Sequence, residues 1–179
     1  MNRELLINWL KNYTSSFVVE ISFREKFLEL LQHKDSFQRH HLPGHITGSA
    51  WIVDSSKQFV LLTHHAKLNK WLQPGGHADG EEDVLNVALR EATEETGIKQ
   101  FKTLRSGIFD IDIHTIPSRK EFPEHLHYDI RFLLEADKNE GLLITEESHA
   151  LRWVSIDQLE TITNGNESMM RMANKVNLL

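Results

Sequence analysis

The sequence predicts an α/β or α+β fold, because segments with helical spacing of apolar residues alternate with segments rich in β-branched and aromatic residues. Residues 1–44 are expected to form a helical extension. Residues 45–160 hold the strand-like segments and one long helical segment, and residues 161–179 are expected to end the chain as a helix. At 179 residues the chain is long enough to bury one hydrophobic core, so we expect a single domain over residues 1–179.

Two apolar stripes predict two helices in the N-terminal extension. A capping box formed by Ser22 and Glu25 is expected to start the second helix. The two helices could form a hairpin packed on the rest of the domain, or an element for dimerisation or for covering a substrate, so a homodimer is left open. The first stripe consists of Leu5, Leu6, Trp9 and Leu10, and the second of Phe27, Leu28, Leu30 and Leu31.

Strand patterns follow from residue 46 onward. Residues 46–54 and 58–65 are rich in β-branched and aromatic residues, with a turn-like DSSK segment between them. Residues 108–114 and 125–133 alternate between apolar and polar side chains, so each is expected to have one buried and one polar face in an antiparallel pair. Residues 151–154 read as a last strand, after which Ser155 is expected to cap a helix that reaches Leu159.

Composition excludes several classes of protein. The formal net charge of −6 argues against a groove for nucleic acid, because phosphate binding requires a basic surface. The absence of cysteine excludes disulfides, thiolate nucleophiles and cysteine-based zinc sites. The first 13 residues carry charges and no uninterrupted apolar run, so neither a signal peptide nor a membrane partner is expected. A cytoplasmic enzyme is the default interpretation.

Residues 76–98, GHADGEEDVLNVALREATEETGI, are the most informative segment. Glu91, Glu94 and Glu95 have the i, i+3, i+4 spacing that places side chains together on one helical surface. Like charges so placed destabilise a helix unless a cation compensates them, and hard divalent ions such as Mg²⁺ bind carboxylate oxygens. The core-facing residues of this helix are expected on a different arc from the glutamates, namely Leu85, Ala88, Leu89 and Ala92.

The same segment resembles the Nudix box at every defined position, namely Gly76, Glu82, Arg90-Glu91, Ala92, Glu94-Glu95, Gly97 and Ile98. The resemblance implies an α/β/α sandwich around a mixed β-sheet. It also implies a hydrolase that uses Mg²⁺ or Mn²⁺ to cleave a nucleoside diphosphate linked to another group, such as a nucleotide sugar or ADP-ribose. The alternative is a non-catalytic Nudix-like module that binds a nucleotide ligand. The intact box favours the enzyme, because such modules usually lack box carboxylates.

By resemblance, Glu91, Glu94 and Glu95 bind the metal and activate water, and either Glu91 or Glu94 is the general base. Arg90 is expected to form a salt bridge that orients a carboxylate, which places it in the catalytic group with Glu91 and Glu94. Gly76, or else Gly75, is expected to offer a backbone carbonyl to the metal from a tight Gly-Gly turn.

Other residues are expected to support the box. Glu82 lies near the helix start, where the helix dipole favours negative charge, and Gly97 suits a left-handed helix end. The family often recruits a further acid from a loop beyond the box. The candidates are Glu121, Glu124, Glu146 and Glu147, with Glu146 and Glu147 ranked ahead because they precede the final strand.

The chain has eleven histidines, whose role the box does not explain. His125 and His127 share a strand face and could direct two imidazoles to a zinc ion, but an oxygen-rich cluster prefers hard metals, so zinc is not favoured. Substrate contact is instead expected for His77, His127, Asp129 and Arg131, the alternative being an ordinary polar face. Arg131 could grip a phosphate bidentately or bridge to carboxylates across the sheet. No sequence feature outside the box identifies the substrate.

Overall fold

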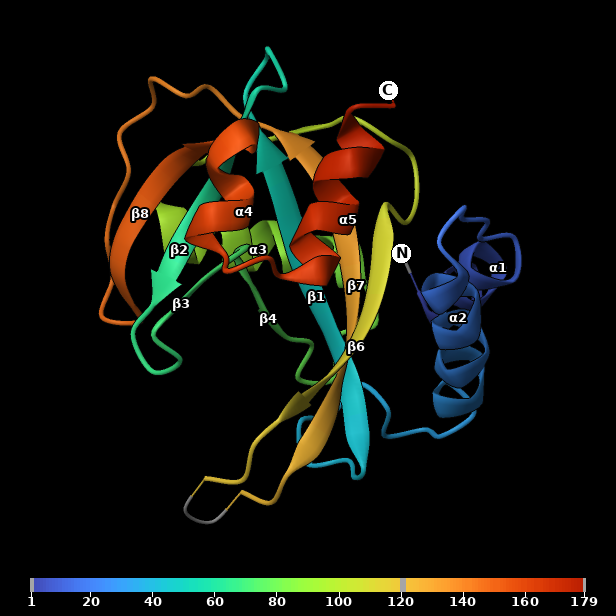
Figure 1. Cartoon of the computed structure of the whole chain (residues 1–179). Coiled ribbons are helices and arrows are strands. Elements are labelled where there is room, and N and C mark those ends of the chain that lie inside the picture. The colour runs from blue at the N-terminus through green and yellow to red at the C-terminus, as the bar shows by residue number, and fades with distance from the viewer. Residues whose placement is uncertain (1, 120–121, 179) are drawn as a thin grey trace. The chain divides into compact units, whose positions relative to one another are not determined.

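The computed structural model describes residues 2–119 and 122–178 (Figure 1). The chain forms two compact units. Unit 1 comprises Met1–Ser49, Gly76–Ala88 and Gly107–Phe132. Unit 2 comprises Ala50–Gly75, Leu89–Ser106 and Leu133–Leu179. Three strands and one helix pass along the chain from one unit into the other, namely β1 (Gly44–Val53), β4 (Gly75–His77), β7 (His125–Glu135) and α3 (Val84–Thr96).

Unit 1 contains the predicted helical hairpin and the predicted antiparallel strand pair. Helix α1 (Arg3–Lys11) packs against α2 (Val18–Leu30). The predicted stripes are only partly turned inward: Leu5 is exposed, Trp9 and Leu28 are half-buried, and the buried members are Leu6, Leu10, Phe27, Leu30 and Leu31. Strand β6 (Asp110–Ile116) pairs with β7 in the register that runs from Asp110↔Arg131 to Ile116↔His125. The connection between them is largely exposed, as expected, and Glu121 lies outside the described residues.

The expected start of the second helix was wrong. Helix α2 begins at Val18 with Phe17 as its N-cap, so Ser22 lies inside the helix and cannot cap it. Glu20, in the first turn, has a fully buried carboxylate instead. It accepts hydrogen bonds from the Tyr13 hydroxyl at 2.6 Å and from the backbone N–H of Ile111 at 3.2 Å. This carboxylate therefore fastens the hairpin to β6 in unit 1.

Unit 2 is built around β2 (Phe59–His65). This strand pairs antiparallel with β3 (Lys70–Leu72), with β8 (Ser148–Ser155) and with the end of β1 at Val53↔Val60. Strand β5 (Lys102–Thr103) pairs with the end of β7. The hydrogen-bonded strand order is β3-β2-β1-β7-β5, with β4 (Gly75–His77) beside β1. The predicted strands at 46–54, 58–65 and 151–154 are thus confirmed.

The C-terminal elements also belong to unit 2. Ser155 occupies the N-cap position of the 3₁₀ turn η1 (Ile156–Gln158), as predicted, but its side chain makes no capping hydrogen bond. Helix α4 (Leu159–Ile162) follows, and α5 (Glu167–Val176) confirms the expected closing helix. No helix in the described part of the chain is long and apolar enough to cross a membrane.

Helix α3 carries the box, and its buried stripe differs from the predicted one. Ala88 and Ala92 are buried as expected, but Leu85 and Leu89 are only half-buried. Val84 and Val87 are fully buried in their place. The stripe is therefore rotated toward the side of the helix that also carries Glu91 and Glu95. Gly97 ends the helix with φ +79°, as predicted, and donates its N–H to Thr93 O at 2.9 Å.

Candidate metal and nucleotide site

The box glutamates lie at different depths along the last turns of α3 in unit 2. The Glu91 side chain is 14% exposed, whereas that of Glu94 is 60% exposed. Glu95 is half-buried, and its Oε1 accepts a hydrogen bond from the backbone N–H of Gly75 at 3.0 Å. The expectation that all three occupy an arc separate from the core was wrong, because Glu91 and Glu95 flank the buried stripe. Glu94 alone faces solvent.

Burial and mutual repulsion make this cluster unfavourable for negative charge. Burial, together with the charges of Glu91, Glu147 and Glu94, raises the pKa of Glu95 to about 7, in spite of the hydrogen bond from the Gly75 N–H. Burial also raises the pKa of Glu91, which Arg90 opposes and which Glu94 and Glu147 reinforce. A hard divalent cation would relieve both effects and prefers oxygen ligands, so the residues present fit such an ion.

Arg90 lies beside two of these carboxylates. Its Nη1 donates to Glu91 Oε1 at 2.7 Å and approaches Glu94 Oε2 at 3.4 Å. The interaction has the form of the orienting salt bridge that the resemblance implies. Glu147 is the loop acid that acts on both Glu91 and Glu95, and Ala66 N donates to its backbone carbonyl at 2.9 Å. Glu146 is exposed.

The Gly-Gly segment does not form the tight turn that was predicted. Gly75–His77 is the short strand β4, and neither Gly75 nor Gly76 has a positive φ. The extended backbone aims the Gly75 N–H at Glu95, so this segment positions a carboxylate through a donor group. The role of the Gly76 carbonyl as a metal ligand stays a prediction.

Glu82 has a partner that sequence patterns did not suggest. Its carboxylate accepts from Arg3 Nε at 2.9 Å and from the backbone N–H of Arg3 at 3.2 Å. Both residues belong to unit 1. Glu82 therefore joins the box loop to the start of α1, and its supporting role for the box carboxylates stays a prediction.

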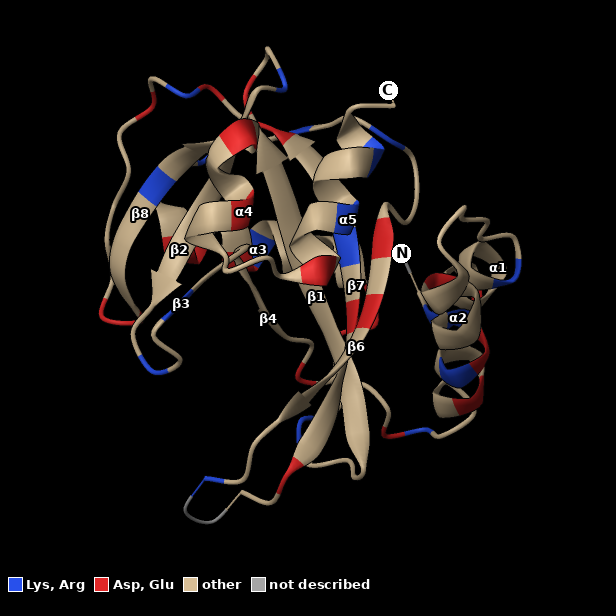
Figure 2. Ribbon diagram, viewed as in Figure 1, with Lys and Arg blue, Asp and Glu red and all other residues tan. Residues whose placement is uncertain are grey.

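Asp129 and Arg131 form a buried ionic network in unit 1, where Figure 2 shows acidic segments of β6 beside a basic segment of β7. Arg131 contacts Asp129 at 2.7 Å, Asp110 at 3.1 Å and Asp112 at 3.3 Å. Burial lowers the pKa of Arg131, but the three carboxylates outweigh it and raise the pKa above its usual range. Of the two roles considered for Arg131, the structure therefore shows the bridge to carboxylates across the sheet. Asp129 and Arg131 are each only 2% exposed, which leaves almost no surface for the substrate contact expected of them.

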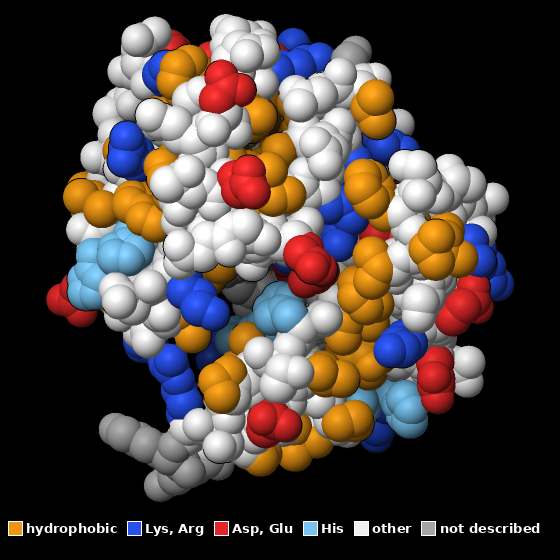
Figure 3. Space-filling view, in the orientation of Figure 1, with side chains coloured by type: hydrophobic (Ala, Val, Ile, Leu, Met, Phe, Trp, Pro, Cys, Tyr) orange, Lys and Arg blue, Asp and Glu red, His pale blue; other side chains and the backbone are white. Residues whose placement is uncertain are grey.

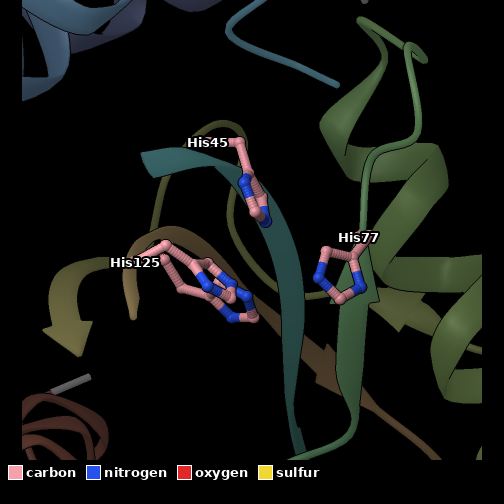
Figure 4. A group of neighbouring side chains, drawn as sticks. His45, His77 and His125 are labelled. Carbon is pink, nitrogen blue, oxygen red and sulfur yellow. The ribbon is translucent and has the colours of Figure 1, made fainter. Parts of the chain in front are cut away.

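Four histidines gather in unit 1, where Figure 4 shows the His45, His77 and His125 rings turned toward one another. His45 comes from β1, His77 from β4, and His125 and His127 from β7. Burial lowers the pKa of His45 to about 4, of His127 to about 2, and of His77 below its usual range, and neighbouring positive charges contribute. The expected substrate contacts of His77 and His127 stay predictions.

Sequence reasoning missed His45. It stands just before the apolar run that marked the first strand, so the strand pattern gave it no distinct signal. One signal could have identified His45 as a site residue. It is a histidine at the start of a buried strand in a chain that also carries a His-x-His pair, His125 and His127, on another strand.

An aromatic pair lies on the surface of unit 2. The His64 ring stacks on the Trp71 ring with centroids 4.9 Å apart, across the β2–β3 register pair His64↔Trp71. His149 of β8 approaches His64 at 5.5 Å. Figure 3 shows histidine side chains beside hydrophobic ones where β2 and β8 reach the left edge of the view. Trp71 precedes Gly75 by four residues, a span of at most ~14 Å.

Comparison with known proteins agrees with this geometry. The NUDIX domain family model matches residues 43–173. A probable DHNTP pyrophosphohydrolase from Lactococcus lactis is 31% identical over 134 residues, covering 70% of this chain and 78% of that protein. The asymmetrical bis(5'-nucleosyl)-tetraphosphatase of Rattus norvegicus is 27% identical, covering 68% and 76%. The human m7GpppN-mRNA hydrolase NUDT17 is 31% identical, covering 62% of this chain and 38% of that protein.

Solved structures share the fold. The dihydroneopterin triphosphate pyrophosphohydrolase of E. coli superposes with a TM-score of 0.57 at 15% identity, covering 75% of this chain and 96% of that one. The architecture is therefore the mixed α/β fold of Nudix proteins, as the box implied. With an intact box on α3 and a family match over most of its length, the chain belongs to the Nudix family of hydrolases, which act on phosphoric anhydride bonds.

Proposed function

We propose that this protein hydrolyses the polyphosphate chain of a small nucleotide-type or pterin-type compound, with Mg²⁺ or Mn²⁺ held by the box carboxylates. The observation that carries the proposal is the half-buried acidic cluster of α3, in which the pKa of Glu95 is raised to about 7. Such a cluster gains stability when a divalent cation replaces the protons that burial would otherwise favour.

Each residue of the cluster has a distinct part. Glu91, Glu94 and Glu95 would hold the ion, with Glu147 adding negative charge nearby. A divalent ion held there would offset charge on the anhydride and make water an effective nucleophile near neutral pH. Gly75 fixes the orientation of Glu95, and Arg90 fixes that of Glu91. Glu91 or Glu94 accepts the proton of the attacking water.

The substrate class rests on the relatives. Their names describe dihydroneopterin triphosphate, bis(5'-nucleosyl) tetraphosphate and capped mRNA as substrates. These compounds share a polyphosphate chain attached to an aromatic heterocycle through a short linker. The net charge of −6 disfavours a long nucleic acid, since its phosphates would be repelled. A small compound with the same chain fits better, and nucleotide sugars or ADP-ribose remain the second choice.

The stacked Trp71–His64 pair offers a place for the heterocycle. Its rings are half-exposed, and stacking a base on an aromatic side chain contributes ~1–3 kcal/mol. We predict that Trp71→Leu raises KM at least about fivefold, a loss of ~1 kcal/mol, while kcat changes little. The matched control is Trp9→Leu, on α1 in the other unit, which should leave KM unchanged. Steady-state kinetics with the best substrate would check this, and a fall in kcat with unchanged KM would contradict it.

The proposed function is tested by a substrate panel with Mg²⁺ or Mn²⁺. It contains dihydroneopterin triphosphate, dinucleoside tetraphosphate, nucleoside triphosphates, a capped dinucleotide, a nucleotide sugar and ADP-ribose, with products separated by ion-exchange chromatography. We expect metal-dependent turnover of a compound with three or more phosphates. Turnover confined to diphosphates would overturn the substrate class. No turnover of any compound, together with tight nucleotide binding, would show a non-catalytic module.

A further inference from the structure

Four histidine side chains in unit 1 converge in a way that the acidic cluster of α3 does not require. One ring nitrogen from each of His45, His77, His125 and His127 can be chosen so that all four lie within 4.8 Å of one another. The ring centroids of neighbours in the group are 4.9–5.3 Å apart. The four residues come from three strands, so their convergence is a tertiary feature and not a consequence of local sequence (Figure 4).

Two buried ring nitrogens of this cluster lack a hydrogen-bond partner. His45 Nε2 and His127 Nε2 are both buried and have no hydrogen-bond partner in the structure. A buried polar atom left unsatisfied costs ~1–3 kcal/mol, so such atoms need an explanation. Two in one cluster of imidazoles point to a common partner that both nitrogens share.

Backbone carbonyls hold two of the four rings through their Nδ1 atoms. His125 Nδ1 lies 2.8 Å from Pro123 O, and His45 Nδ1 lies 3.4 Å from His41 O. A carbonyl oxygen only accepts, so each Nδ1 carries the proton and each Nε2 keeps its lone pair. A second nitrogen that donates to a backbone carbonyl is the usual arrangement of a metal-binding histidine.

We propose that His45, His77, His125 and His127 bind one divalent transition-metal ion, for which Zn²⁺ is the best match. Four imidazoles without a carboxylate suit borderline metals, whereas Mg²⁺, Mn²⁺ and Ca²⁺ prefer oxygen. Tetrahedral zinc with bonds of ~2.0–2.1 Å separates its nitrogens by about 3.4 Å. The most distant nitrogens, up to 4.8 Å apart, must therefore approach by as much as about 1.4 Å, which rotation about the side-chain bonds permits.

The site would stabilise structure rather than take part in hydrolysis. Four protein ligands leave no open position, which is typical of structural zinc sites. Because His77 lies inside the box loop between Gly76 and Glu82, the ion would tie this loop to β1 and β7 within unit 1. The inference does not depend on the proposed function, since the histidines and the acidic cluster are separate sets of residues.

Zinc binding is tested on the untagged full-length protein after chelator treatment. We expect calorimetry to show that the protein binds one equivalent of Zn²⁺. His127→Gln should weaken the affinity for Zn²⁺ at least ~100-fold. Removing the hydrogen-bond partner of a metal ligand typically weakens metal affinity ~10–100-fold, and removing the ligand itself should cost more. The exposed His40→Gln is the matched control and should bind as the wild type does. Glu95→Gln should also keep the zinc site, which separates this result from any failure of the hydrolase proposal.

A spectroscopic measurement on the wild type avoids dependence on the folding of a variant. The Co²⁺-loaded protein should show the intense visible bands of tetrahedral coordination, and the Cu²⁺-loaded protein should show hyperfine coupling to several imidazole nitrogens. Two results would overturn the proposal. One is the absence of stoichiometric Zn²⁺ or Co²⁺ binding, and the other is a spectrum of oxygen ligands alone, with binding lost in Glu95→Gln and kept in His127→Gln.

Discussion

Glu95 combines burial, a fixed orientation and three acidic neighbours, so its side chain should be the most sensitive in the box. We predict that Glu95→Gln folds normally but loses at least ~100-fold in metal-dependent turnover, the loss expected when one group that stabilises transition-state charge is removed. The exposed Glu160→Gln is the matched control in the same unit and should keep full activity. Kinetics with saturating Mg²⁺ would check this, and normal turnover of Glu95→Gln would refute its assignment as a metal ligand.

Arg131, in contrast, is expected to contribute to stability rather than to substrate binding. It is the cation shared by Asp110, Asp112 and Asp129, all of them buried. Arg131→Met removes the guanidinium that all three buried carboxylates share, which should cost ~3–5 kcal/mol in the free energy of unfolding.

Urea denaturation followed by fluorescence would measure this cost. Arg105→Met, at an exposed position, is the matched control and should change stability by less than ~0.5 kcal/mol. A near-neutral effect of Arg131→Met, coupled to a large rise in KM, would return Arg131 to the substrate site.

At the scale of elements, alternation located the strands but misjudged their environment. Residues 108–114 were expected to have one polar face, and Asp110 on that face is fully buried. The reason is the register Asp110↔Arg131, which supplies a cation from a strand some twenty residues away. The pattern of residues along one strand does not predict which residue of another strand will lie opposite. The spacing of the box, in contrast, lies within one loop and helix, so its helix, its left-handed end at Gly97 and its paired Arg90 were all predictable.

The N-terminal hairpin also depends on a distant pairing, between Arg3 of α1 and Glu82 of the box loop. Because the Glu82 side chain is 41% exposed, solvent screens the pair. We predict that Arg3→Gln and Glu82→Gln each destabilise the protein slightly, and that a double-mutant cycle gives a coupling energy of about 1 kcal/mol or less. Turnover should fall less than about tenfold in both variants. A collapse of kcat in Glu82→Gln alone would show that Glu82 acts at the metal rather than on α1.

At the scale of the whole molecule, the histidine cluster should govern stability on the acid side. In the metal-free protein the pKa values of His45 and His127 fall from 6.5 to about 4 and about 2. As pH falls below 6.5, His45 and His127 become protonated in the unfolded chain but stay neutral in the folded protein, so the folded protein loses stability. The loss should approach ~1.4 kcal/mol per pH unit for each histidine. Urea denaturation at several pH values in a chelator would show it, with a shallower slope in His127→Gln.

Above pH 6.5 these histidines are neutral in both states, and Glu95 determines the remaining slope. Its pKa rises from 4.5 to about 7 on folding. Between these two pKa values the folded state holds a proton that the unfolded state has lost. The contribution of Glu95 to the stability of the metal-free protein therefore falls as pH rises from 4.5, and it levels off once Glu95 has ionised above about pH 7. Mg²⁺ binds the ionised form, so adding it at pH 8 should raise the melting temperature and remove the slope. Glu95→Gln should show neither the slope nor the Mg²⁺ effect. A wild-type melting temperature that rises between pH 6.5 and 8 in the chelator would contradict the burial of a destabilised carboxylate at this position.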